Sequence, residues 1–203
     1  MTGLRLAAFA LVVFALALFP FGAGNYPVKL LQEILIMGIF AMSLDLLMGY
    51  AGMVSFGHSA FFGIGGYVAA LALAKDPGLV SALLLPALAA GLAALVIGSF
   101  SIRVSGVYFI MLTLAFSQMF FAYTFQVSWL GAEDGLVGIP RPRVPGWDLG
   151  SLRGFHAYLL VLVALAVLVL WRVVRSPFGH VLRGIHENEA RMEALGYPVD
   201  RYK

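Results

Sequence analysis

Long stretches without a single charge are the feature that most restricts how this chain can fold. Five stretches of the 203-residue sequence contain no Asp, Glu, Lys or Arg: residues 6–28, 46–74, 77–102, 104–132 and 154–171. Each can hold an apolar helix of roughly 18 to 20 residues, the length that crosses the hydrocarbon core of a bilayer. Trimming the apolar regions at their Gly, Pro and polar ends places spans at residues 5–22, 30–48, 54–74, 79–100, 106–125 and 157–174. The sequence therefore predicts an all-α fold, a polytopic transmembrane helical bundle of about six spans.

The composition excludes several classes of protein. Hydrophobic residues make up 62% of the chain and charged residues 11%, whereas soluble domains are nearer ~45–50% and ~25%. A chain this small cannot hide so much apolar surface in water, which excludes a soluble enzyme or a nucleic-acid-binding protein. The absence of cysteine excludes a disulfide framework, a thiolate metal site and a cysteine nucleophile.

The remaining charges give the chain an orientation in the membrane. The tail carries six basic residues: Arg172, Arg175, Arg183, Arg191, Arg201 and Lys203. Because positive residues beside a span stay on the cytoplasmic side, we expect a cytoplasmic tail. Counting back through six spans puts the amino terminus and Arg103 on that same side. In the first span Arg5 precedes an apolar core, as in a signal peptide, but five more spans follow, which favours an uncleaved anchor.

The chain lacks the sequence motifs of an enzyme. It contains no GxxxxGK[ST] phosphate-binding loop, so we expect neither ATP hydrolysis by this chain nor a cofactor bound to it. The four histidines lie in different segments without HExxH spacing, and Ser55 with His58 lacks an acidic partner at a diagnostic distance. Neither a metal site nor a hydrolase triad is predicted.

A glycine-rich segment lies where the second and third predicted spans meet. Residues 49–66 contain six glycines. On a continuous helix, one face from here onward would carry only small side chains: Ser55, Ser59, Gly63, Gly66, Ala70 and Ala74. Such a stripe lets another helix approach closely, which is how helices associate in lipid. A broken helix would instead expose Ser55, His58 and main-chain groups to a water-filled path. The residues alone favour packing, and both interpretations stay open.

The carboxy-terminal segment combines a helix start, an amphipathic face and a helix end. Ser176 and Pro177 form a good N-cap and first-turn pair. Five apolar residues then fall on one helical face: Phe178, Val181, Leu182, Ile185 and Met192. We expect Gly184 to break this helix and Gly196 to end it. A short amphipathic cytoplasmic helix indicates a contact for a soluble partner. Binding along anionic lipid is the alternative, which the three glutamates within residues 187–193 disfavour.

Four strings of the chain together resemble one protein family: residues 43–67 (SLDLLMGYAGMVSFGHSAFFGIGGY), 106–117 (GVYFIMLTLAFS), 135–140 (GLVGIP) and 176–203. They look like the LivM-type permeases of branched-chain amino-acid ABC importers, occur in that family's order, and cover most of the chain from about residue 30. The resemblance implies a multi-pass permease of the bacterial inner membrane, surrounded by lipid. It also implies partners, namely a second permease subunit, two ATP-binding subunits that carry the ATP, and an extracytoplasmic substrate-binding protein.

The same resemblance implies roles for particular residues. Residues 1–175 would form the permease bundle, and residues 176–203 a cytoplasmic coupling loop that leads to missing carboxy-terminal helices. Six residues of this loop match the positions that dock into the ATPase: Gly184, Glu187, Asn188, Glu189, Ala194 and Gly196. Three residues become candidates for lining the translocation path: Ser55, His58 and Thr113. Because family members continue past the coupling loop, the chain resembles a permease truncated at its carboxy terminus.

The resulting prediction is a permease subunit that passes small polar solutes by ATP-driven alternating access. Branched-chain amino acids are the solutes that the resemblance implies first, and urea, amides or sugars are the alternatives. A non-transporting structural subunit of the membrane is a second class of function. Such a subunit would tolerate changes in residues 187–196 that a transporter would not, which distinguishes the two.

Overall fold

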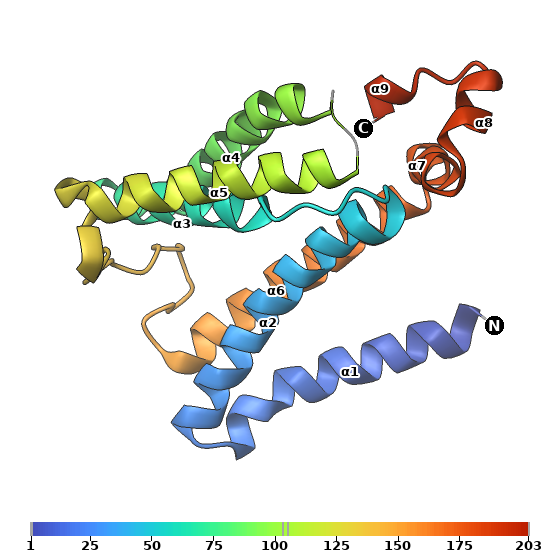
Figure 1. Ribbon diagram of the computed structural model, residues 1–203. Coiled ribbons are helices and arrows are strands. Elements are labelled where there is room, and N and C mark those ends of the chain that lie inside the picture. The colour runs from blue at the N-terminus through green and yellow to red at the C-terminus, as the bar shows by residue number, and fades with distance from the viewer. Residues whose placement is uncertain (1, 103, 105, 203) are drawn as a thin grey trace. The chain divides into compact units, whose positions relative to one another are not determined.

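The computed structural model describes residues 2–102, 104 and 106–202, which fold into helices; a long irregular connection over residues 135–151 precedes the last of the long helices (Figure 1). The six long helices are α1 (Thr2–Gly22), α2 (Asn25–Asp45), α3 (His58–Lys75), α4 (Leu79–Ser101), α5 (Val107–Gln126) and α6 (Leu152–Val174). The shorter elements are the π-helical turn η1 (Leu46–Tyr50), the 3-10 turns η2 (Ser128–Leu130) and η3 (Ala132–Asp134), and α7 (Pro177–Glu187), α8 (Glu189–Ala194) and α9 (Val199–Tyr202). The described residues form no β-strand, so the predicted all-α class is confirmed.

Four helical segments are long and apolar enough to cross a membrane: Asn25–Tyr50, Leu79–Ser101, Val107–Gln126 and Leu152–Val174. The predicted polytopic arrangement is therefore confirmed. The predicted number of about six spans is confirmed only for these four. In α1 the apolar segment covers Leu11–Gly22. In α3 the helix forms as predicted, but its serine, histidine and glycines dilute the apolar residues, and it is not among the four.

The exposed surface of α4 shows why such helices need lipid. None of the apolar window of this helix is buried within the described chain. Large side chains such as Leu88, Leu92 and Leu95 are each more than half exposed. Contiguous apolar surface of this kind is unstable in water and stable against acyl chains or a neighbouring helix.

The chain forms two compact units, and each unit is made of two separate stretches. The first unit comprises Met1–Met42 and Arg143–Arg172, and the second comprises Ser43–Pro142 and Val173–Lys203. The predicted division was by location: a membrane bundle of residues 1–175 and a cytoplasmic coupling loop of residues 176–203. The compact units do not test this division, which stays a prediction.

In the first unit, a proline in α1 is matched by a histidine in α6. Pro20 has no N–H group, so the carbonyl of Leu16, four residues earlier, lacks its helical donor. His156 Nε2 lies 3.0 Å from that carbonyl oxygen. A carbonyl oxygen only accepts, so the ring proton is on Nε2. The His156 side chain, 1% exposed, thus donates the hydrogen bond that the proline removed.

Replacing His156 with leucine is expected to destabilise the first unit by about 1 to 3 kcal/mol, because the Leu16 carbonyl then stays buried without a donor. Nδ1 of the same ring is buried and has no partner among the described atoms, so a substitute needs to reproduce only the Nε2 donor. His156→Gln, whose amide nitrogen reaches a similar position, should keep most of the stability. Thermal unfolding in detergent measures both variants, and equal losses would contradict the assignment.

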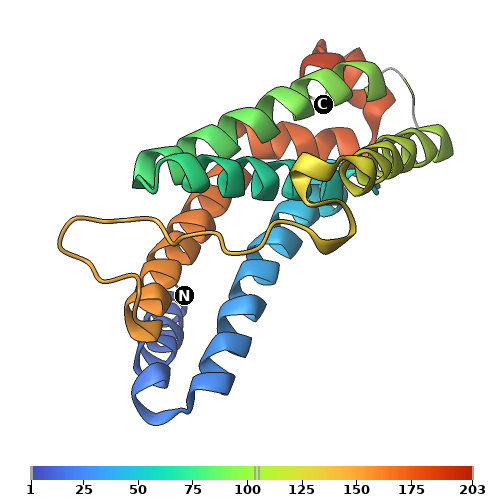
Figure 2. The same ribbon diagram turned by 90° about the vertical axis from the view of Figure 1, so that its left-hand side faces the viewer.

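In the second unit, α3 and α4 form a hairpin, and α5 packs on both (Figures 1 and 2). Small residues permit close contact between α3 and α5. Ser59 Oγ lies 3.0 Å from Ser117 Oγ, and one turn later Gly63 faces the ring of Phe120. Helices in lipid associate through such small side chains and interhelical hydrogen bonds. The predicted close packing by the small residues of α3 is therefore confirmed at these two positions.

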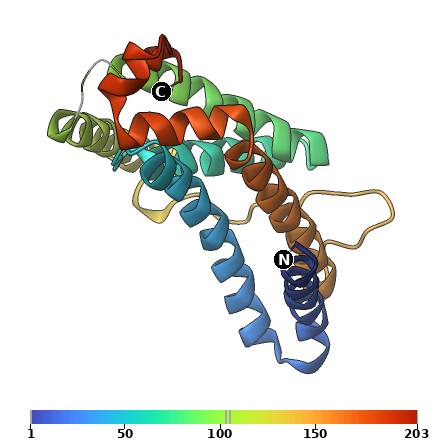
Figure 3. The same ribbon diagram turned by 90° about the vertical axis from the view of Figure 1, so that its right-hand side faces the viewer.

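The carboxy-terminal helices of the second unit fold on one another. α7 contacts both α8 and α9, and α8 contacts α9 (Figure 3). Phe178 of α7 stacks on Tyr202 of α9, with the ring centroids 5.9 Å apart. Of the predicted amphipathic face, Leu182 and Ile185 are buried, whereas Phe178 is 43% exposed. Val199 of α9, which was not part of that face, is buried as well. The tail is therefore a compact helical cluster.

Candidate functional site

The glycine-rich segment interrupts the helical path between α2 and α3. α2 continues into η1, where the amide of Ala51 donates to the Leu46 carbonyl (3.3 Å) in the wide i to i−5 pattern of a π-helix. Residues 51–57 are not helical, and α3 begins at His58. The predicted broken helix is confirmed. Ser55 precedes α3, so the prediction that it shares a helical face with Ser59 is wrong: the break turns the chain before that face begins.

Two of the predicted path residues lie together at this break. The amide of Gly57 donates to Ser55 Oγ (3.2 Å), and the amide of Phe56 donates to Thr113 Oγ1 (3.2 Å). Thr113 Oγ1 in turn donates to the carbonyl of Ile110 (3.0 Å). Both hydroxyl-bearing side chains are buried, at 5% and 4% exposure. They satisfy main-chain groups that the broken helix would leave without partners, and they attach the break to α5.

The third predicted path residue, His58, points to a different partner. It is the first residue of α3 and is half-buried, and its Nε2 lies 2.7 Å from Ser43 Oγ near the end of α2. The structure therefore places Ser55 and Thr113 at two successive peptide units, with His58 next in the chain but hydrogen-bonded to Ser43.

A groove of about 450 Å³ between α3 and α5 adds polar residues that the sequence analysis did not propose for the translocation path. Ser59, Ser117 and Thr124 line it together with an aromatic wall, and Glu133 and Asp134 of η3 lie at its border. On α5, four residues recur at helical spacing and define the side facing α3: Thr113, Ser117, Phe120 and Thr124. The helical spacing of the three hydroxyl-bearing residues among them, Thr113, Ser117 and Thr124, was a signal in the sequence that could have identified the groove side of α5.

The start of α7 forms as predicted. Ser176 Oγ accepts from the amide of Gly179 (3.3 Å), and Pro177 occupies the first helical position. The helix then continues through Gly184 to Glu187, so the predicted break at Gly184 is wrong. A Cβ atom on Gly184 would lie 2.8 Å from Sδ of Met192 in α8. This glycine therefore gives α8 room to pack on α7, and its backbone stays helical.

The actual break lies at Asn188. Its backbone is extended (φ −162°, ψ 99°), and its Oδ1 accepts from the amide of Arg191 (2.9 Å), which caps α8. Gly196 (φ +86°) ends the segment as predicted, because its amide donates to the Glu193 carbonyl (2.9 Å) in a left-handed turn that favours glycine. α7 and α8 thus meet at a sharp corner, which we call the α7–α8 corner, residues 187–189.

Five of the six predicted coupling residues are exposed: Glu187, Asn188 and Glu189 form the corner, and Ala194 and Gly196 lie at the end of α8 and just after it. The sixth, Gly184, is half-buried in the contact of α7 with α8. Arg103 and Lys203, which entered the predicted orientation, lie outside the described residues. The corner therefore presents carboxylate and amide groups that a soluble partner can reach.

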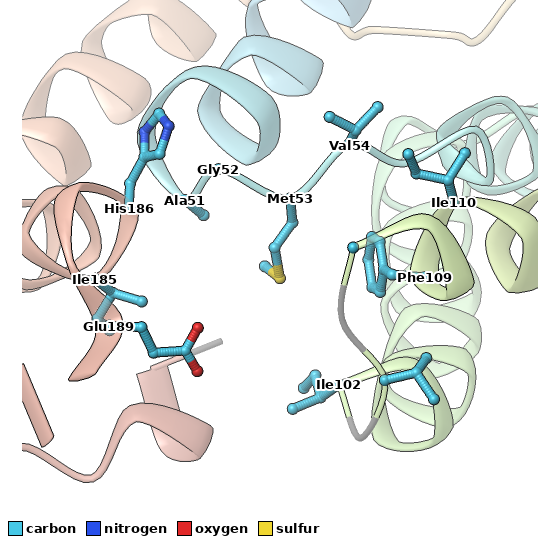
Figure 4. Close-up of a pocket in the computed structure, with 12 residues that line it drawn as sticks. Ala51, Gly52, Met53, Val54, Ile102, Phe109, Ile110, Ile185, His186 and Glu189 are labelled. Carbon is cyan, nitrogen blue, oxygen red and sulfur yellow. The ribbon is translucent and has the colours of Figure 1, made fainter.

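A cavity of about 200 Å³ separates this corner from the membrane helices (Figure 4). Residues 51–54 of the break form one wall, Phe109 and Ile110 of α5 form another, and Ile185, His186 and Glu189 close the third side. The break with the candidate path residues and the corner with the candidate coupling residues thus border a common space within the second unit.

Comparison with known proteins identifies the family. A protein-family model described as "Branched-chain amino acid transport system / permease component" matches residues 26–203. The high-affinity branched-chain amino acid transport system permease protein LivM of Salmonella typhimurium is 27% identical over 224 residues, covering 98% of this chain and 52% of that protein. LivM of Escherichia coli strain K12 is 28% identical over 225 residues, with the same coverage of 98% and 52%.

A third similar protein comes from Methanocaldococcus jannaschii. The probable branched-chain amino acid transport permease protein LivM of Methanocaldococcus jannaschii is 26% identical over 198 residues, covering 79% of this chain and 56% of that protein. The chain spans about half the length of the curated relatives it matches. No solved structure is significantly similar to it. Because the family match extends over residues 26–203 and four helical segments can cross a membrane, the chain belongs to the branched-chain amino acid transport system permease family and is a multi-pass membrane protein.

Proposed function

We propose that this chain is a permease subunit of an ABC importer in a bacterial inner membrane, with its tail in the cytoplasm. The α7–α8 corner carries this proposal. It is a pair of short helices whose buried face packs against its own unit and whose exposed tip carries Glu187, Asn188 and Glu189. Closure of two partner ATPase subunits on ATP would move this corner and drive alternating access. ATP would bind to the partners only.

The proposed solutes are branched-chain amino acids, delivered by an extracytoplasmic binding protein to this chain and a second permease subunit. The names of the three relatives, all of which are branched-chain amino acid permeases, support this class. In the proposed path, Ser55 and Thr113 hold the break in shape through their main-chain hydrogen bonds. His58 and the groove between α3 and α5 supply polar groups to the solute.

The partners are tested by purifying the tagged chain from its host in mild detergent and identifying the proteins that accompany it. An ATPase and a second permease are expected. Glu187→Lys reverses a charge at the corner, and Gly196→Val places a β-branched residue at positive φ, so both should release the ATPase. Glu193→Lys is the matched control, because it reverses an exposed charge on α8 outside the predicted docking set. Retention of the ATPase by both corner variants would favour a structural subunit.

The solute is tested separately by uptake of labelled leucine, isoleucine and valine in cells that depend on this chain. Competition by excess urea, a short amide or a sugar then compares the alternatives. Uptake that only branched-chain amino acids compete with supports the proposal. Uptake inhibited by one of the other solutes, and not by leucine, would replace the proposed solute while leaving the permease assignment intact.

A further inference from the structure

One side chain joins the coupling segment to the break in the helical path. His186, in the last turn of α7, places its Nδ1 3.1 Å from the carbonyl oxygen of Gly49 in η1. The two residues are 137 positions apart in the sequence. Because the carbonyl oxygen can only accept, the proton of this hydrogen bond lies on Nδ1 of His186.

The Gly49 carbonyl is suited to accept a side-chain donor. The last carbonyls of a helix have no main-chain partners within the helix, and Gly49 belongs to the final turn before the break. Beyond it, the amides of Ala51 and Met53 donate to Leu46 and Leu47. His186 therefore satisfies a group that the end of the helix leaves open.

Gly52 provides the space that the His186 ring occupies. Its φ of +71° lies in the left-handed region, where a side chain causes strain. A Cβ atom on Gly52 would also lie 2.6 Å from Cδ2 of His186 and 3.0 Å from Cγ. The imidazole thus rests directly on the backbone of the break, as Figure 4 shows. The 200 Å³ cavity lies next to this contact. The ring therefore connects α7 to the break at the edge of a space that side chains do not fill.

We propose that His186 is a positioning residue that clasps α7 to the break, so that movement of the α7–α8 corner is passed to residues 49–57. This inference rests on the proposed function. Ser55 and His58 lie on, or directly after, the segment that His186 holds. Displacement of α7 would therefore change the position of the candidate path residues through one hydrogen bond and one ring contact.

The same helix provides a matched control. His180 is also exposed on α7, and its Nδ1 lies 2.9 Å from the carbonyl oxygen of Ser176 within the start of its own helix. Both histidines thus hydrogen-bond to a carbonyl, but only the His186 bond crosses to η1. Removing each ring separates the loss of a histidine on α7 from the loss of the clasp.

The first experiment uses hydrogen exchange on the chain in detergent. In His186→Ala, amides of residues 49–54 should exchange about five- to tenfold faster, because a hydrogen bond that holds them is lost. His186→Asn, whose amide nitrogen occupies a position similar to Nδ1, should restore most of the protection, and His180→Ala should leave these amides unchanged. Equal exchange in His186→Ala and the unsubstituted chain would overturn the clasp.

The glycine in contact with this ring gives an independent variant. Gly52→Ala should expel the ring and reproduce the exchange pattern of His186→Ala. Gly146→Ala controls for backbone strain alone, because Gly146 also has positive φ (+78°) but has nothing within 4 Å of the added Cβ. If the amides of residues 49–54 exchanged in Gly52→Ala as slowly as in the unsubstituted chain, the His186 ring would not be in contact with Gly52.

The second experiment tests transmission in the assembled transporter. His186→Ala should retain bound ATPase and basal ATP hydrolysis while lowering the number of solutes moved per ATP at least fivefold, and His186→Asn should recover coupling. An unchanged ratio of transport to hydrolysis, despite faster exchange at the break, would overturn the transmitting role. A chain without substitution that recovers no ATPase would instead refute the proposed function, while the exchange experiment still decides the contact.

Discussion

Replacing Gly179 with alanine is expected to abolish transport, because the added methyl group has no space at the start of α7. Gly179 is buried, and a Cβ atom there would lie 2.6 Å from the carbonyl oxygen of Val173 and nearer still to that of Val174. Both obstacles are main-chain atoms at the end of α6, which cannot rotate away as a side chain would. α7 must therefore tilt from its position.

The expected destabilisation is about 3 kcal/mol, at the upper end of overpacking in a well-filled site. A loss of this size corresponds to roughly a hundredfold lower population of the correctly formed corner. Gly91→Ala in α4 is the matched control, since it adds the same methyl group to a helical glycine with nothing within 4 Å. The control should be neutral or stabilising by up to ~1 kcal/mol. Solute uptake, ATPase recovery and thermal unfolding in detergent measure both variants, and normal uptake by Gly179→Ala would contradict the prediction.

Replacing Gly63 with leucine is expected to separate α3 from α5 and to lower uptake by about tenfold or more, as overpacking of 1 to 3 kcal/mol predicts. A Cβ atom on Gly63 would lie 2.8 Å from Cε1 of Phe120, whose ring packs edge-on against Tyr67 at 6.3 Å between centroids. Leucine adds three further carbons in the direction of this ring. The neighbouring contact of Ser59 with Ser117 would lengthen with it.

A double variant that enlarges residue 63 and shrinks residue 120 tests whether steric overlap causes the loss of uptake. Phe120→Ala removes the ring that leucine would strike, so the double variant Gly63→Leu, Phe120→Ala should recover part of the uptake and stability lost in Gly63→Leu. Thermal unfolding of the four members of the cycle gives the interaction energy between the two sites. Gly65→Leu is the control on the same helix, because Gly65 has nothing within 4 Å. Additive losses from Gly63→Leu and Phe120→Ala would show that the two side chains do not compete for space.

The sequence predicted the elements well because local signals define them. Charges at the ends of apolar segments and helix-capping residues act over a few positions, and the six long helices lie close to the predicted spans. Ser176 with Pro177 starts α7, and Gly196 ends the tail segment, as their types predict. The glycines of residues 49–57 left a broken helix as one of two open interpretations, and the structure shows the break before α3.

Contacts between distant residues were not accessible in this way. Pro20 indicates that the Leu16 carbonyl loses its donor, but only the packing of α1 with α6 identifies His156 as the substitute. Gly184 resembles a helix breaker in sequence, yet its backbone is helical, and the absence of a side chain there leaves space for Met192. Thr113 was selected by resemblance, and its bond to the amide of Phe56 depends on how α5 packs against the break.

The sequence by itself thus determined that the chain is a multi-pass helical membrane protein and roughly where its long helices lie, since lipid solvation and main-chain capping are local requirements. Its family could be inferred from four strings of residues. Tertiary structure alone decided that His186 meets Gly49 and that Ser55 and Thr113 meet at one turn. These pairs depend on helix packing, in which van der Waals fit and interhelical hydrogen bonds select partners that no spacing along the chain encodes.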